Sequence, residues 1–407
     1  MTASQTGKER ISSYGKSPPM TLTQSEIPQN APWIEINLDN LIHNLTQIRT
    51  LLPPSIGIMA VVKDNAYGCG SVMISRILEA HSVRFFAVSR ICEARTLREA
   101  GVKSPILVLG PARKEDLHWG TAAGIRFSLN DLSDMAVWKT LKIPIRFHVK
   151  IDTGMSRLGL LPEETRAFIT ELQAPVNLSC EGVYTHFAKA DDLDSGSIDL
   201  QMTSFRKVIG DFNANGVQLS EIHYANSAAI MRHRVEHCTM VRPGIALYGC
   251  KPNPAQDFSL DLKPVLCMKG RVLKMKRVAA GVAVSYGGTY VTASDTTIAT
   301  IGLGYGQGLP RQLGNKGAVL IRGRRYGIVG RVTMDYIMVD AGADPHFSVG
   351  DEVVAMGNQG NESIHPDEIA LLCNTIAYEI LCSINSSIDR QYILNGKVIH
   401  REQCKPF

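Results

Sequence analysis

The feature that most constrains the fold is an alternation of short apolar runs with amphipathic stretches, which extends from about residue 33 to residue 262. Runs that are apolar along their whole length suit strands buried on both faces of a parallel sheet. The runs are Ile56–Val62, Phe85–Val88, Ile106–Leu109, Ile145–Val149 and Leu178–Tyr184, with a shorter one near Ile222. Candidate helices lie among them at Ser71–Ala80, Cys92–Ala100, Asp131–Thr140, Glu163–Leu172 and Leu200–Phe212. The alternation predicts repeated β–α units and a parallel sheet.

Units of this number and length predict a TIM-type (β/α)8 barrel, a fold that commonly occupies about 250 residues. An open, doubly wound sheet is the alternative, although no GxGxxG motif follows the first strand.

After residue 263 the pattern changes to strand-like segments separated by glycine-rich turns, which predicts a second, mainly antiparallel domain. These segments are Val265–Val278, Val282–Tyr286, Thr297–Ile301, Ala318–Ile321, Tyr326–Gly330, Tyr336–Val339 and Glu352–Met356. A helical pattern returns only at Pro366–Cys382. We therefore expect a disordered extension at 1–32, the barrel at 33–262, the β domain at 263–400 and a tail at 401–407.

Composition excludes several classes of protein. The net charge of +5 is spread thinly over 407 residues without a block of Lys and Arg, so we expect no nucleic-acid partner. No apolar stretch approaches the roughly 18 residues of a membrane span, and residues 1–32 lack the apolar core of a signal peptide. Nine scattered cysteines without a CxxC pair predict neither a disulfide framework nor a metal site, and they favour a reducing, cytoplasmic compartment.

One lysine, Lys63, stands where the first apolar run ends, in the segment AVVKDNAYGCG (60–70). The carboxyl ends of barrel strands form the active face of such folds. A primary amine that is buried there loses its proton more readily and can act as the nucleophile of Schiff-base chemistry. The alternative is a solvated lysine at the start of a surface loop.

Three further segments carry polar side chains where barrel strands should end: HVKIDTGMSRLG (148–159), VYTHFA (183–188), and HYANSAA (223–229) followed by VRPGIALYG (241–249). Taken singly, His186 is typical of a hydrogen-bonded histidine in a protein core, and Arg242 is typical of one partner in a buried ion pair. Asn226 and Ser227 suit a helix N-cap. Together with Lys63, they would place an amine, hydroxyl groups, a guanidinium and an imidazole on one rim of one barrel.

In combination these motifs resemble those of the alanine racemases, pyridoxal 5'-phosphate (PLP) enzymes with an α/β barrel and a C-terminal β domain. The resemblance runs from about Trp33 to Tyr392. Lys63 matches the family lysine that holds the cofactor covalently, and Tyr67 matches a tyrosine that contacts the cofactor phosphate. The other residues that the resemblance places at the cofactor are His186, Asn226, Ser227, Arg242, Gly244, Ile245 and Tyr378. Hydroxyl groups and backbone amides suit a phosphate.

The resemblance implies an isomerase that interconverts L-alanine and D-alanine and supplies D-alanine for cell-wall peptidoglycan. Racemisation needs a base on each face of the substrate, and the matching residues are Lys63 and Tyr286. By itself, Tyr286 suits a strand tyrosine before a Gly-Gly turn. In the family, the residues matching Tyr286 and Met334 reach the partner's barrel in a head-to-tail homodimer, where the amide of Met334 would help to bind the substrate carboxylate.

Two arginines acquire roles from the same resemblance. Arg242 matches the residue that faces the pyridine nitrogen, and a guanidinium keeps its proton, so the ring stays a weaker electron sink and racemisation is favoured over transamination. Arg157 matches a residue that pairs with the cofactor phenolate and the substrate carboxylate. Lys150 matches a lysine that is often carbamylated, which would remove the repulsion between two adjacent cations.

The chain departs from the family pattern at Asp64, Cys69, Gln307, Thr333, Ser387 and Asp389. These positions leave the assigned chemical groups in place and affect the expected substrate range, for which alanine is the first expectation and serine a lesser one. A barrel-type PLP decarboxylase is a rival interpretation, but a carboxylate is expected in place of Arg242. A non-catalytic PLP-binding barrel is another, and it would lack the whole segment after Pro264.

Overall fold

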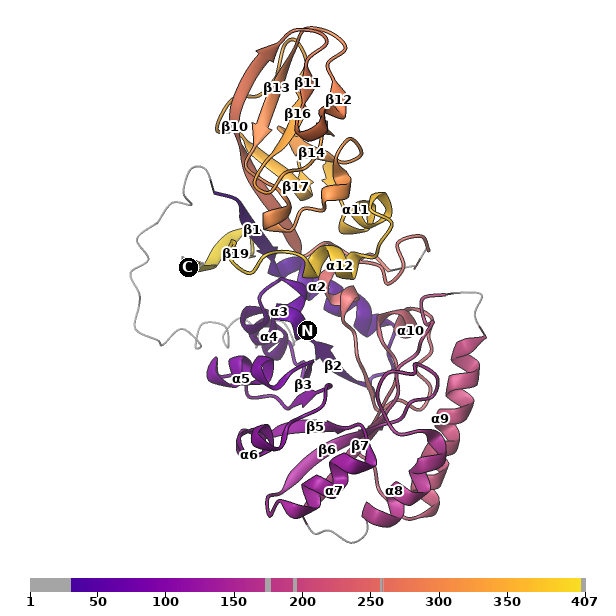
Figure 1. The fold of residues 1–407 in the computed structure, drawn as a ribbon. Helices are drawn as coiled ribbons and strands as arrows, with labels where there is room; N and C mark the ends of the chain where they lie inside the picture. The colour runs from indigo at the N-terminus through magenta and orange to yellow at the C-terminus, as the bar shows by residue number, and fades with distance from the viewer. Residues whose placement is uncertain (1–30, 173–176, 193–195, 257, 259, 404–407) are drawn as a thin grey trace.

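The computed structural model describes residues 31–172, 177–192, 196–256, 258 and 260–403. It contains a parallel barrel and a second, mainly antiparallel sheet, which lies above the barrel in Figure 1. The segments at 1–30 and 404–407, which hold most of the expected disordered extension and tail, lie outside the described residues. Within the described ranges, no helix is both long and apolar enough to span a bilayer.

The barrel is built from eight parallel strands in the order β8-β7-β6-β5-β4-β3-β2-β9. They are β2 (Gly57–Val61), β3 (Phe85–Val88), β4 (Ile106–Val108), β5 (Ile125–Leu129), β6 (Ile145–Lys150), β7 (Leu178–Tyr184), β8 (Glu221–His223) and β9 (Met240–Val241). The two edge strands approach each other, because Thr239 N donates to Ile222 O at 2.9 Å and Arg242 N donates to Ala225 O at 2.7 Å. The barrel is thus nearly closed, which confirms the predicted fold.

Helices surround the barrel. They are α2 (Leu38–Thr50), α4 (Ser71–Ala80), α5 (Ile91–Glu99), α6 (Lys114–Ala122), α7 (Leu132–Thr140), α8 (Thr165–Leu172), α9 (Ser197–Ala214) and the short α10 (Ser227–Met231). The start of α7 illustrates how the sequence sets a boundary, because the side chain of Asp131 accepts the Ser133 N–H at 2.7 Å as an N-cap. Trp138 of the same helix packs edge-on against Phe127 and Phe147 of the strands beneath it.

The second sheet has ten strands in the order β18-β17-β14-β15-β16-β13-β10-β1-β19-β20. They are β1 (Trp33–Asn37), β10 (Leu266–Val278), β13 (Thr296–Ile301), β14 (Ala318–Ile321), β15 (Arg324–Val329), β16 (Ile337–Asp340), β17 (Glu352–Gln359), β18 (Glu362–Ile364), β19 (Asp389–Leu394) and β20 (Lys397–Glu402). A small hairpin joins β11 (Ala283–Val284) to β12 (Tyr290–Val291).

Strand β1, which the expected division places with the barrel, pairs instead within the second sheet. It runs antiparallel to β10 and parallel to β19. From Ile34 its sequence, Ile-Glu-Ile-Asn, alternates apolar and polar residues, which is typical of a strand with one face in the core. The described chain therefore begins and ends in the same sheet.

Two local expectations differ from the structure. The predicted helix at Pro366–Cys382 is divided into α11 (Pro366–Leu372) and α12 (Ala377–Cys382). The break follows from Asn374, whose φ of 54° ends the first helix. Tyr286 lies beyond its predicted strand, because β11 ends at Val284 and a 3-10 turn (Tyr286–Gly288) follows with Gly287 at φ 74°.

Candidate active site

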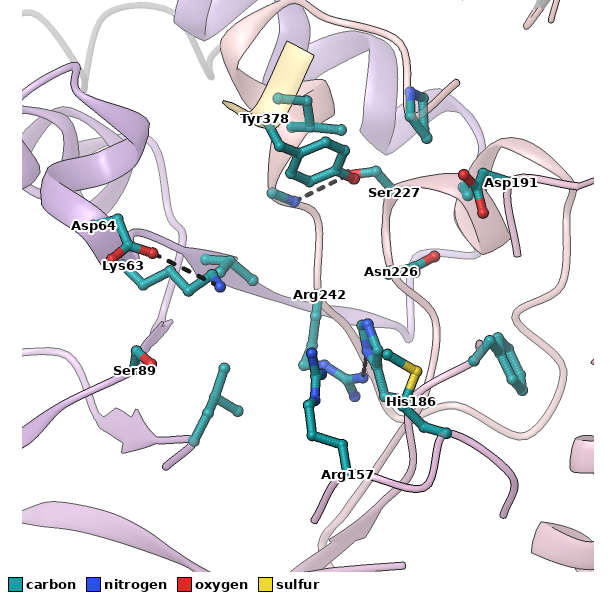
Figure 2. Close-up of a pocket in the computed structure, with 18 of the residues that line it drawn as sticks. Lys63, Asp64, Ser89, Arg157, His186, Asp191, Asn226, Ser227, Arg242 and Tyr378 are labelled. Atoms are coloured by element: carbon teal, nitrogen blue, oxygen red, sulfur yellow. Dashed lines mark hydrogen bonds and ion pairs between the residues drawn. The ribbon is translucent and has the colours of Figure 1, made fainter. Parts of the chain in front are cut away.

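A cavity of about 560 Å³ opens at the carboxyl ends of the barrel strands, and Figure 2 shows the side chains that converge on it. It is lined by the following residues singled out from the sequence: Lys63, Tyr67, Lys150, Arg157, His186, Asn226, Ser227, Arg242, Gly244, Ile245 and Tyr378. Lys150 ends β6, Arg242 directly follows β9, and Lys63 and His186 lie two residues after β2 and β7, as the barrel architecture requires of an active face. One chain thus brings together two amines, two guanidinium groups, an imidazole and several hydroxyl groups.

Lys63 begins α3 (Lys63–Tyr67), a turn with an unusual backbone. Its residues Asp64, Asn65, Ala66 and Tyr67 have φ values of 52° to 53°, so the turn is left-handed although none of the four is glycine. Both Lys63 and Tyr67 line the cavity from this turn. The Lys63 Nζ atom lies 3.7 Å from the Asp64 carboxylate.

One end of the cavity is suited to bind a phosphate. Ser227 Oγ accepts the N–H groups of Gly244 at 3.0 Å and Ala246 at 3.3 Å. A Cβ atom at Gly244 would lie 2.7 Å from the Tyr67 hydroxyl oxygen, so only glycine permits this close approach. Burial raises the pKa of the Tyr67 and Tyr378 phenols, and both stay neutral hydrogen-bond donors.

Arg242 lines the cavity and is only 4% exposed. Its Nη1 atom donates to His223 Nδ1 at 2.7 Å, and its Nη2 atom donates to Thr185 O at 2.8 Å and to His186 Nδ1 at 3.3 Å. Burial lowers the pKa of Arg242 to about 10, so the guanidinium is still protonated at neutral pH. It therefore acts as a fixed donor and obliges both histidine nitrogens to accept.

This donor fixes the tautomers of a chain of buried histidines. Because His223 Nδ1 accepts from Arg242, the proton of a neutral His223 sits on Nε2, which lies 2.7 Å from His148 Nδ1. Burial, followed by the charges of Arg126 and Arg242, lowers the pKa of His148 to about 3. Burial and then the Arg242 charge lower the pKa of His186 to about 3 and that of His223 well below its usual value. All three rings are consequently neutral at neutral pH.

Lys150 and Arg157 are two further basic residues that line the cavity. Burial, and next the positive charge of Arg157, lowers the pKa of Lys150 to about 8. The loop that carries Arg157 is shaped by Asp152, whose carboxylate accepts four successive backbone N–H groups, from Gly154 to Arg157. Arg157 thus owes its placement to a carboxylate that lies just beyond strand β6.

Two predicted site residues do not line the cavity of the same chain. Tyr286 and Met334 belong to the second-sheet region, where their side chains are 71% and 57% exposed. Tyr305 is also exposed, and it lies next to the Met334 segment: its N–H donates to Thr333 O at 3.0 Å, and the next amide, Gly306 N, donates to Met334 O at 2.8 Å.

The cavity also contains residues that the sequence did not single out for a role. They are Asp64, Ser89, Tyr184, Asp191, Ile376 and Cys382, among others. Asp191 lies five positions after His186 in the same loop, and Ile376 lies two positions before Tyr378. Nearness to a predicted site residue was the available signal in both cases.

The chain matches known proteins along most of its length. Family models described as "Alanine racemase, N-terminal domain" and "Alanine racemase, C-terminal domain" match residues 36–252 and 265–392. An alanine racemase of Carboxydothermus hydrogenoformans is 41% identical over 368 residues, which cover 89% of this chain and 99% of the relative. An alanine racemase of Syntrophobacter fumaroxidans is 41% identical over 358 residues, which cover 86% of this chain and 95% of the relative.

Solved structures agree with this likeness. The alanine racemase of Bacillus anthracis, crystallised with bound L-Ala-P, superposes with a TM-score of 0.84 at 34% identity and covers 93% of this chain and 99% of its own. The alanine racemase of Clostridium difficile 630 superposes with a TM-score of 0.86 at 36% identity, with the same coverage.

Proposed function

The chain belongs to the alanine racemase family (EC 5.1.1.1), whose members depend on PLP, and we propose that Lys63 and Tyr286 are the two bases with which it interconverts L-alanine and D-alanine. One observation carries the PLP-dependent activity: a single cavity holds the Lys63 amine and the hydroxyl groups of Tyr67, Ser227 and Tyr378, which would bind the cofactor phosphate. When bound, PLP supplies an electron sink for the negative charge that develops at the substrate Cα.

The residues present fit this cofactor. The hydroxyl groups of Tyr67, Ser227 and Tyr378 and the backbone at Gly244 and Ile245 would hold the phosphate without adding full charges. Asn226 and His186 line the same cavity and would flank the cofactor, and Lys63 would bind its aldehyde carbon. Arg242 would face the pyridine nitrogen as a donor that keeps its own proton.

The two proton-carrying groups have different surroundings. Lys63 accepts or returns a proton at Nζ on one face of the substrate. Tyr286 does so at its phenol oxygen on the other face, and a phenol needs polar neighbours to act as a base. His186 would help, because its Nδ1 accepts from Arg242 and leaves the proton of the neutral ring on Nε2 as a donor.

We propose that Tyr286 acts in the site of a second subunit. Its exposure of 71%, together with the exposure of Met334 and Tyr305 in the same second-sheet region, supports a surface that contacts another copy of the chain. In the resulting head-to-tail homodimer, the amide of Met334 and the guanidinium of Arg157 would bind the substrate carboxylate.

Carbamylation of Lys150 is part of the proposal. A neutral amine attacks CO₂ and releases one proton, which leaves an anionic carbamate. The lowered pKa of Lys150 makes the neutral amine available near pH 8, and the carbamate would hold Arg157 in place of repelling it.

The remaining proposals concern the division into domains, the cellular location and the use of the product. The family matches support a division into a barrel at 33–262 and a β domain at 263–400, apart from strand β1. Free cysteines among the described residues are compatible with a cytoplasmic enzyme, and D-alanine would serve peptidoglycan synthesis.

Arg242 argues against the rival PLP decarboxylase, for which a carboxylate is expected at this position.

The decisive test is exchange of the α-proton in deuterated solvent, followed by NMR on each alanine enantiomer with the PLP-loaded wild-type enzyme. We expect deuterium at Cα together with inversion from either enantiomer. Exchange with full retention, or release of CO₂, would contradict racemisation. The Tyr286→Phe variant should lose mainly abstraction from L-alanine, and equal loss for both enantiomers would contradict the two-base assignment.

A further inference from the structure

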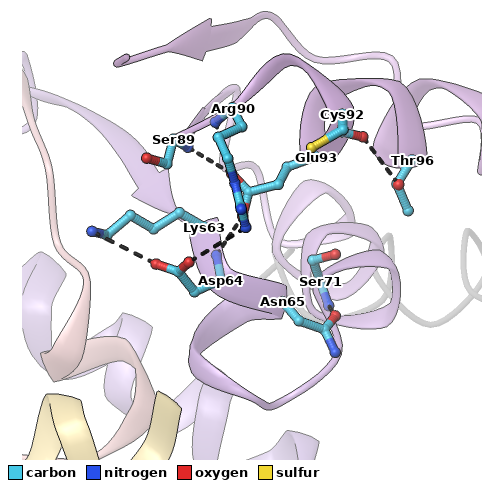
Figure 3. Close-up of polar contacts among 9 residues, drawn as sticks. All are labelled: Lys63, Asp64, Asn65, Ser71, Ser89, Arg90, Cys92, Glu93 and Thr96. Atoms are coloured by element: carbon cyan, nitrogen blue, oxygen red, sulfur yellow. Dashed lines mark hydrogen bonds and ion pairs between the residues drawn. The ribbon is translucent and has the colours of Figure 1, made fainter. Parts of the chain in front are cut away.

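We infer that Glu93, which does not line the cavity, is a positioning residue whose carboxylate braces the left-handed turn carrying Lys63 and Tyr67 (Figure 3). This inference rests on the proposed role of Lys63 at the cofactor. It concerns how the chain holds the amine and the phosphate-binding hydroxyl in one fixed relationship.

The turn needs a brace because its backbone is unfavourable. Left-handed φ values place Cβ close to the following carbonyl oxygen, and single residues are usually the limit outside glycine. Here the four residues Asp64–Tyr67 adopt such values in succession. Contacts from the surrounding structure must therefore hold the segment in place.

The last part of the turn has its own anchors. Asn65 uses its backbone carbonyl to accept Gly70 N–H at 2.9 Å and its side-chain Oδ1 to accept Ser71 N–H at 2.9 Å. Arg390 of the second sheet donates from Nε to Gly68 O at 3.0 Å. These bonds fix the backbone after Asp64. They do not involve the peptide group that joins Lys63 to Asp64, whose N–H needs another acceptor.

Glu93 provides that partner. Its Oε1 atom accepts the Asp64 N–H at 2.6 Å, a short bond to a charged acceptor. Its Oε2 atom accepts the N–H groups of Ser89 at 2.8 Å and Arg90 at 2.9 Å. One carboxylate, with its side chain 13% exposed, thus joins the ends of the neighbouring strands β2 and β3. It fixes the plane of the peptide from which the Lys63 side chain projects.

A purely structural role for Glu93 is the competing explanation. Glu93 is the third residue of α5 and returns to the backbone of Arg90 as in a capping box. Glutamine serves a capping box as well as glutamate does. In Glu93→Gln, the amide oxygen can keep the bonds to Ser89 and Arg90, while the NH₂ group faces the Asp64 N–H and cannot accept. This variant therefore removes the brace and retains the helix cap.

The experiment compares wild type, Glu93→Gln and Glu99→Gln, all loaded with PLP. Glu99 is exposed on the same helix, so its variant controls for the loss of one charge. We expect Glu93→Gln to hold PLP roughly tenfold more weakly, as for loss of one hydrogen bond to a charged group. Hydrogen exchange of the 60–70 segment, followed by mass spectrometry, should be faster. The kcat should fall with little change in KM for alanine, because the amine is misplaced.

Two outcomes would overturn the inference. One is that Glu93→Gln matches Glu99→Gln in PLP affinity and in exchange of the 60–70 segment. The other is that it lowers the unfolding midpoint and exposes α5 to exchange without altering the 60–70 segment, as loss of a helix cap would. Failure of the proposed function looks different, because wild type itself would then show no borohydride-trapped cofactor on Lys63.

Discussion

Lys63 and Tyr286 lie in different regions of the same chain: Lys63 lines the cavity above the barrel, whereas Tyr286 is 71% exposed in the second-sheet region and does not line it. The proposed function requires Lys63 and Tyr286 to act on opposite faces of one substrate, so the two groups must meet at one site. The separation within one chain is therefore the strongest structural argument for a site shared between subunits.

Subunit mixing tests the shared site. Neither Lys63→Ala nor Tyr286→Phe should support racemisation alone, but a hybrid dimer would contain one site with both residues intact. Random reassembly of equal amounts should restore about one quarter of the wild-type activity, because half of the dimers are hybrids with one intact site. Racemisation of alanine after mixing and refolding measures this. A mixture no more active than its parents would contradict the shared site.

Carbamylation of Lys150 should depend on pH in a defined direction. With a pKa of about 8, the neutral amine grows from about one tenth of the molecules at pH 7 to about one half at pH 8. At a fixed concentration of dissolved ¹³CO₂, the carbamate signal in ¹³C NMR should rise over this range. Lys150→Gln should lack the signal. A signal of equal strength in that variant would assign the carbamate to another amine.

The buried histidines should make the protein sensitive to acid. The pKa of His148 and His186 is 6.5 in the unfolded chain and about 3 in the folded one, so the unfolded state binds more protons between these values. Their contribution to stability is fully present above pH 6.5 and is lost as the pH falls towards 3. Each contributes a slope of about 1.4 kcal/mol per pH unit to the free energy of unfolding.

Replacing His148 should reduce the pH dependence of the free energy of unfolding by up to the contribution of one proton, about 1.4 kcal/mol per pH unit. Asparagine at this position keeps an acceptor for His223 Nε2, whereas leucine leaves that N–H unpaired at a further cost of about 1–3 kcal/mol. Urea unfolding at several pH values between 4.5 and 7.5 measures both quantities. An unchanged slope in His148→Asn would show that His148 is not neutral in the folded protein.

Arg390 should matter both for stability and for the Lys63 turn. Its guanidinium is 2% exposed and donates to the main-chain carbonyls of Gly68, Asn385, Ser386 and Ile388. Arg390→Met should lower the free energy of unfolding by about 3 kcal/mol or more, because buried carbonyls lose a charged donor. The free energy of unfolding of Arg390→Lys, measured by urea titration, should lie between those of the wild type and Arg390→Met. Equal stability of the Met and Lys variants would show that the charge contributes nothing there.

Much of the barrel could be predicted because its signals are local. The apolar runs located most of the strands, and Lys63 stood out because it follows one of them directly. The runs failed to predict β5, whose apolar pattern is interrupted by Arg126 and Ser128, and β9, which is only two residues long. Both omissions come from strands whose apolar character is short or broken.

Features that depend on distant pairing could not be predicted. Nothing in Trp33–Asn37 indicates that its partners are β10 and β19, because the pairing is decided by residues hundreds of positions away. The brace by Glu93 depends on β2 and β3 being neighbours, and a glutamate near a helix start suggests only a cap. The left-handed run at Asp64–Tyr67 has no glycine to mark it.

The pairing of β1 with β19 has a consequence for biosynthesis. Trp33 lies opposite Asp389 in a parallel register, so the first described strand has both of its neighbouring strands only after β19 has left the ribosome. Arg390, the residue after Asp389, can donate its hydrogen bond to Gly68 O only at the same late stage. Proteins dominated by such long-range contacts fold slowly, and their early segments stay exposed during synthesis. A nascent chain that stalls after the barrel would thus have its lysine in place but lack the arginine that fastens the adjoining turn.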